Sequence, residues 1–157
     1  MSDRSEALAR RIELGARTLA EYAQGLTGVQ WRTKVMPDGR TVGVIVHHVA
    51  SVYPIEVHLA SEVAAGKAVG VTWDVVADMN AKHAAEHAKA GKAETIALLL
   101  KNSRAAAESV RAFTDAQLDT AAPFSLNADA PLTAQFVIED HPVRHAWHHL
   151  ARIKKAL

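Results

Sequence analysis

The chain has 157 residues, nine histidines and no cysteine, and its formal net charge at pH 7 is +1. This length predicts a single domain over 1–157, the balanced charge gives no basic surface for nucleic acid, and the lack of cysteine excludes disulfides and thiolate metal ligands. The N-terminal stretch is charged and has no apolar signal-peptide core, and no stretch approaches about eighteen apolar residues. We therefore expect a cytoplasmic protein with no membrane-spanning segment.

The first half of the chain predicts two long helices. Apolar residues recur every three or four positions, which is the helical period. One helix is predicted at 5–26, and a turn at 36–40 separates it from a second helix at 41–65. Pro54 lies inside the second helix and should bend it, because a proline leaves the carbonyl of Ala50 without its helical partner.

The second half predicts one short and two long helices. The short helix is expected at 74–90, and a long helix follows at 92–113. The segment 120–131 is predicted to be a loop, and the last helix covers 132–156, with a distortion at Pro142. Four long helices with brief connections predict an all-α four-helix bundle. The short helix would be an addition to the crossover between the second and third long helices.

Histidines gather on the last helix, in the stretch HPVRHAWHHL. Positions four apart on a helix differ by about 40° in direction, so His145 and His149 share a face and could chelate one metal ion. His141 and His148 fall in the same sector, so the spacing leaves the choice of pair open. A third ligand would have to come from another helix. His48 is the candidate, because it lies within the apolar stripe of the second helix.

Other interpretations of the histidines stay open on spacing alone. His83 and His87 are also four residues apart, and they compete as a metal-binding pair with the simpler reading of a polar helix face. His47 points about 100° away from His48, toward solvent or toward a position beside the ligands. His58 is expected at the surface. His48 could be a hydrogen-bonded core residue, and the C-terminal histidines could simply suit the helix dipole.

Three segments in this order, DGRTVGVIVHHVA, TWDVVADMNAKHA and RHAWHHLARI, resemble the DinB-like superfamily. These four-helix-bundle proteins include the mycothiol-dependent maleylpyruvate isomerases. Their pattern is a second-helix histidine followed by an apolar and a small residue, and then an H-x-x-x-H pair on the last bundle helix. The resemblance covers essentially the whole chain. It implies that His48, His145 and His149 are the metal ligands, ahead of the His141/His145 and His83/His87 pairs.

The resemblance also implies a class of chemistry. An ion held by histidines, Zn²⁺ or Ni²⁺, lowers the pKa of water or of a thiol, which suits S-transfer or isomerisation with a low-molecular-weight thiol, or hydrolysis. Candidates for a general base are Glu56, Asp140 and Glu139, and His141 and His148 are candidates for proton transfer or for supporting the ligands.

The resemblance does not fix the small-molecule substrate. Many relatives have Arg-Gly-Gln after the last histidine, where this chain has Leu-Ala-Arg at 150–152. It also implies a homodimer. The alternative function is a non-catalytic bundle that binds a small ligand or dimerises without metal.

Overall fold

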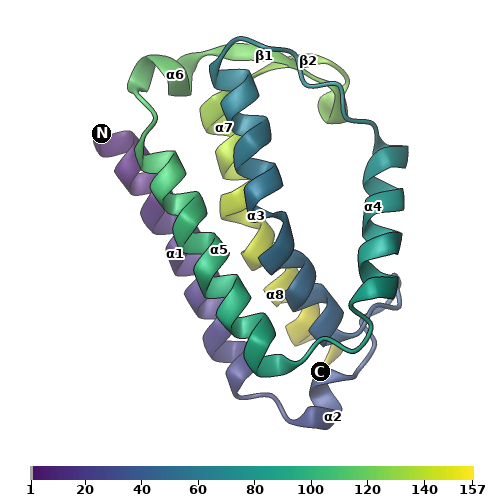
Figure 1. Ribbon diagram of the computed structural model, residues 1–157. Coiled ribbons are helices and arrows are strands. Elements are labelled where there is room, and N and C mark those ends of the chain that lie inside the picture. The colour runs from purple at the N-terminus through teal and green to yellow at the C-terminus, as the bar shows by residue number, and fades with distance from the viewer. Residues whose placement is uncertain (1) are drawn as a thin grey trace.

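A computed structural model describes residues 2–157, and its four long helical rods form one bundle (Figure 1). The rods are α1 (Asp3–Gln24), α3 (Val42–Ala64), α5 (Lys92–Arg111) and a C-terminal rod composed of α7 (Ala134–Ile138), η2 (Glu139–Val143) and α8 (Arg144–Ala156). α5 packs against both α1 and α3, and the C-terminal rod packs against the same two helices. The predicted four-helix bundle is confirmed, and the predicted ends of the long helices are correct to within two residues.

Short elements connect the rods. They are α2 (Gly28–Trp31), α4 (Trp73–Glu86), α6 (Asp115–Asp119), β1 (Ala121–Phe124), η1 (Ser125–Asn127) and β2 (Ala130–Thr133). α4 lies in the crossover between α3 and α5, as predicted, although it ends four residues earlier than expected. It stands apart from the rods in Figure 1, and none of its residues is fully buried.

The segment 120–131, predicted to be a loop, instead contains most of an antiparallel hairpin. β1 pairs with β2 from Ala121 opposite Thr133 to Phe124 opposite Ala130. The prediction was wrong because four-residue strands are too short to show a clear alternating pattern. A tertiary contact also stabilises the hairpin, since the main chain of Val69 exchanges hydrogen bonds with the carbonyl of Pro123 and the N–H of Ser125.

α3 is the core helix of the bundle. By length and composition it could cross a membrane, yet 61% of its most apolar 18-residue window is buried inside the protein. Its N-terminus is capped by Thr41, whose hydroxyl accepts a hydrogen bond from the N–H of Val44. Such burial is typical of a bundle core helix, which has apolar residues on more than one face.

The two prolines have different consequences. α3 continues through Pro54, and the side-chain amide of Asn102 in α5 donates a hydrogen bond of 2.8 Å to the carbonyl of Ala50, the group that proline leaves free. Pro142 lies in η2, a π-helical turn that widens the C-terminal rod. The local distortion at Pro142 is thus confirmed, whereas a bend at Pro54 stays a prediction.

Asn102→Ala should lower the free energy of unfolding by about 1–3 kcal/mol, because it leaves the buried carbonyl of Ala50 without a partner. Urea unfolding measures the loss. In a Pro54→Ala background the same substitution should cost clearly less, since alanine restores a backbone N–H that can bond that carbonyl. Equal costs in the two backgrounds would show that the amide does not compensate for the proline.

Candidate metal centre

Three histidines from two rods converge at one side of α3. His48 comes from α3, and His145 and His149 come from α8. Each offers a ring nitrogen, and these nitrogens all lie within 4.8 Å of one another. The ring centroids are 5.0 Å apart for His48 and His145, 5.5 Å for His48 and His149, and 4.7 Å for His145 and His149. The expected convergence is therefore found, and the role of the three as ligands stays a prediction.

Burial keeps two of these imidazoles, those of His48 and His149, neutral. His48 and His149 are only 6% and 4% exposed. Burial, assisted by the neighbouring His145, lowers the pKa of His48 to about 3 and the pKa of His149 far below its usual range. A neutral imidazole has a free lone pair, which is the form that binds a metal ion.

Glu56 fixes the orientation of His145. Its Oε1 accepts a hydrogen bond of 2.5 Å from Nδ1 of His145, so Nε2 is the nitrogen left to face the other two rings. Glu56 comes from α3, two turns after His48, and it is buried. The sequence suggested a general base at this position. The structure shows a carboxylate that holds a ring in place.

A cleft with a volume of about 420 Å³ opens beside the three histidines. α3, α4, the hairpin and the C-terminal rod contribute its walls. The lining residues are Arg40, His48, Val52, Ile55, Glu56, Leu59, Val71, Trp73, Val75, Val76, Met79, Asn80, Leu126, Asp140, His141, Arg144, His145, His148 and His149. The cleft is large enough for a small organic molecule, and both apolar and polar side chains line it.

The other candidates at the last helix lie around this cleft. His141 and His148 line it, and burial lowers the pKa of both. The ring of His148 is 5.1 Å from that of His149. His141 is not part of the converging group, because it lies in the widened turn η2 and the regular spacing of an α-helix does not reach it.

The two acidic candidates differ in position. Asp140 lines the cleft, where its Oδ1 accepts a hydrogen bond of 2.9 Å from Nε of Arg144. Glu139 is absent from the lining and forms an ion pair of 2.6 Å with Arg11 of α1. Glu139 is therefore no longer a candidate base. Asp140 remains a candidate, although its carboxylate is already paired with Arg144.

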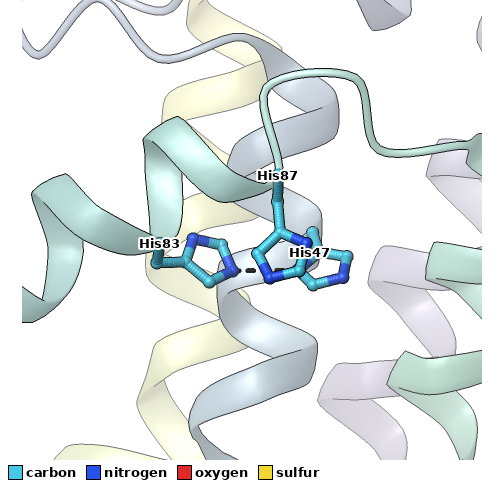
Figure 2. A group of neighbouring side chains, drawn as sticks. All are labelled: His47, His83 and His87. Atoms are coloured by element: carbon cyan, nitrogen blue, oxygen red, sulfur yellow. Dashed lines mark hydrogen bonds between the residues drawn. The ribbon is translucent and has the colours of Figure 1, made fainter.

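Sequence reasoning considered His83 and His87 as a pair but missed that His47 joins them. His47, expected at the surface or beside the ligands, contacts His83 and His87 in a second half-buried group (Figure 2). The signal was present in the tandem His47-His48, since consecutive helical residues point about 100° apart and can serve two different neighbours. The position of His47 in the sequence could not show that α4 lies on the side of α3 to which its ring points. His58 is exposed, as predicted.

Comparison with known proteins identifies the family. The sequence profile of the Mycothiol-S-transferase family matches residues 7–152. The chain belongs to this family. The DinB-like resemblance is thereby confirmed, and it extends over nearly the whole chain. No curated protein sequence matches the chain.

A solved structure has the same fold as this chain. YfiT from Bacillus subtilis, described as a probable metal-dependent hydrolase with an unusual four-helix bundle topology, superposes with a TM-score of 0.77. The two chains are 20% identical, and the match covers 99% of this chain and 87% of YfiT. At this identity the likeness shows the fold alone.

The residues at the convergence fit a divalent metal ion. The donor set consists of three imidazoles, which suit Zn²⁺ and Ni²⁺. Within residues 2–157, the buried Nδ1 of His149 and Oε2 of Glu56 have no hydrogen-bond partner. A carboxylate that holds the far nitrogen of a ligating histidine is also a common feature of metal sites in proteins.

The metal-free protein should lose stability as the pH falls below about 6.5, the ordinary pKa of histidine. Because the folded chain holds the pKa of His48 at about 3, the unfolded chain binds a proton between these values that the folded chain does not. The loss should reach a few kcal/mol toward pH 4, measured by urea unfolding in a chelator. His48→Gln should make the profile flatter. An identical pH profile for this variant would contradict the assigned burial effect.

Proposed function

We propose that the protein is a metal-dependent enzyme that holds Zn²⁺ or Ni²⁺ through His48, His145 and His149. In the proposed reaction, the sulfur of a low-molecular-weight thiol forms or breaks a bond with a small molecule. The observation that carries the proposal is the convergence of these three imidazole rings beside a cleft. Membership of the Mycothiol-S-transferase family supports a thiol as the co-substrate.

The proposed chemistry divides between the ion and the chain. A bound divalent ion supplies Lewis acidity, which lowers the pKa of a thiol or of water. Glu56 keeps the proton of His145 on Nδ1, so that Nε2 presents its lone pair. Apolar side chains from α3 and α4, including Val52 and Met79, line the cleft, and a bound molecule that covers them would displace water and so strengthen the electrostatic interactions there.

Arg40 is suited to bind an anionic group of the thiol or the substrate. Its guanidinium lines the cleft, and one of its nitrogens donates a hydrogen bond of 2.9 Å to Asp38. The other terminal nitrogen, Nη1, is buried and has no partner in the part of the chain that the structure describes. A carboxylate on the bound molecule would satisfy this donor, because guanidinium groups pair with carboxylates in a two-pronged geometry.

Hydrolysis is the second candidate reaction, and the description of YfiT as a probable metal-dependent hydrolase favours it. Either reaction requires a group that accepts a proton from the thiol or the water. His141 and His148 are suited to this step, since their lowered pKa keeps them neutral and they line the cleft. Asp140 is less available for this step, because its Oδ1 already accepts a hydrogen bond from Arg144.

The non-catalytic alternative is not favoured, because the buried carboxylate and the imidazole rings form a metal-binding set in a chain of a transferase family. A cytoplasmic location, a homodimer and the absence of nucleic-acid and membrane partners stay predictions.

Replacement of His48, His145 or His149 by alanine should remove about one metal ion per chain, because two imidazoles bind Zn²⁺ far more weakly than three. Elemental mass spectrometry on untagged, dialysed protein measures the content. Conjugation of a thiol to an electrophilic small molecule should be lost in the same variants and on addition of a chelator. His58→Ala, an exposed histidine on α3, is the matched control. Full metal content in the His48 variant would disprove the site.

Glu56→Gln and Glu56→Ala should weaken Zn²⁺ binding by about 10-fold and 100-fold, respectively, since outer groups that orient a ligand have effects of this size. Glutamine can still accept the hydrogen bond from His145, whereas alanine cannot. Competition with a chromogenic chelator gives the affinities. If both variants bind as tightly as the wild type, Glu56 does not position the ring. If activity is lost at saturating Zn²⁺ while affinity is unchanged, Glu56 is instead a base.

A further inference from the structure

His47, His83 and His87 form a second histidine cluster between α3 and the C-terminal end of α4 (Figure 2). One ring nitrogen from each lies within 4.8 Å of the others. Nδ1 of His47 and Nε2 of His83 are 2.9 Å apart. The ring of His87 stacks on that of His47 with a centroid distance of 3.9 Å, and it lies 4.7 Å from the ring of His83.

The second cluster repeats the construction of the first. In each, α3 contributes one histidine and another helical segment contributes two histidines four residues apart. The consecutive residues His47 and His48 therefore supply one ring to each cluster. The two clusters are neighbours, since the ring centroids of His48 and His83 are 5.7 Å apart.

Hydrogen bonding within the protein does not account for all three rings. A single proton can join His47 to His83, and Ser51 Oγ lies 3.2 Å from the same nitrogen of His47. No side-chain hydrogen bond of His87 occurs among residues 2–157, and the buried Nδ1 of His83 also has no partner there. Hydrogen bonding thus explains one pair of rings, whereas His87 joins the pair by stacking on His47 and leaves its own ring nitrogens without a hydrogen bond among residues 2–157.

The chemical state of the cluster also suits a cation. Imidazole nitrogen is a good ligand for Zn²⁺ and similar ions. In the contact between His47 and His83, Nδ1 and Nε2 already face each other at 2.9 Å. A divalent ion would take the place of this hydrogen bond, and the proton of the contact would move to the other nitrogen of the same ring.

We propose that His47, His83 and His87 form a second binding site for a divalent ion that prefers imidazole nitrogen, such as Zn²⁺. This site is distinct from the one at His48, and it does not depend on the function proposed above. Its three ligands would leave further coordination positions for water.

The ion would have a structural consequence for the cleft. No residue of α4 is fully buried, so this helix packs only loosely on the bundle. α4 nevertheless supplies part of the cleft wall, including Val76 and Met79. An ion shared by His47 of α3, His83 of α4 and His87, the residue directly after α4, would hold that wall in place beside the first cluster.

Zn²⁺ titration of untagged, metal-stripped protein by calorimetry tests the proposal. The wild type should bind about two ions per chain, and His87→Ala and His83→Ala about one each. The loss of a cluster is expected to leave folding intact, because α4 has no buried residue. His145→Ala should also bind about one ion, now at the second cluster, and His58→Ala should bind both. Circular dichroism confirms helical content for each variant.

Hydrogen exchange supplies a second readout that separates the two sites. Zn²⁺ should slow the exchange of α4 amides in the wild type and in His145→Ala, and it should have no such effect in His87→Ala. Binding of one ion by the wild type together with none by His145→Ala would overturn the second site and leave the first intact. Retention of both ions by His87→Ala would also overturn it. If the first site alone does not bind an ion, the wild type and His145→Ala should bind the same number of ions, about one per chain.

Discussion

The hydrogen bond between Glu56 and His145 is the contact on which the arrangement of the first site depends. It joins the core helix to the C-terminal rod across 89 positions of sequence. A buried carboxylate is costly without a partner, so the pairing stabilises both the packing of the two rods and the direction of the ring. The same contact therefore serves folding and the presentation of a ring nitrogen. This explains why α3 tolerates an acidic residue in its buried face.

A proline lies close to each of the two residues of this contact. Pro54 lies two residues before Glu56, and Asn102 of α5 satisfies the carbonyl that proline leaves free. Pro142 lies three residues before His145, in the widened turn that begins the approach of the C-terminal rod to the cleft. Each departure from regular helical bonding thus lies next to a residue of the site. Irregular helical turns are common at such places, because they change the direction of the side chains that follow.

The sequence predicted those features that depend on one helix at a time. The four rods follow from apolar periodicity, and the choice of His48, His145 and His149 follows from an apolar stripe, an i, i+4 pair and the family resemblance. The hairpin and the partner of His47 could not be predicted in this way. Each depends on which element lies alongside, as Val69 does for β1 and α4 does for His47. Short strands and single rings have no periodic signal of their own.

The charge of the cleft favours an anionic ligand under the proposed function. Histidine ligands carry no charge, so an ion held by His48, His145 and His149 would keep its full double positive charge in a partly dry cleft. Arg40 adds a further positive charge, and Asp38, its partner, is shared with Arg152 at 3.0 Å. Among residues 2–157, Glu56 is the carboxylate that forms a hydrogen bond with the triad, and its Oε1 already accepts from His145. A thiolate with a carboxylate group elsewhere in the molecule would balance this charge better than a neutral alcohol or water, and this preference follows from the protein's own groups.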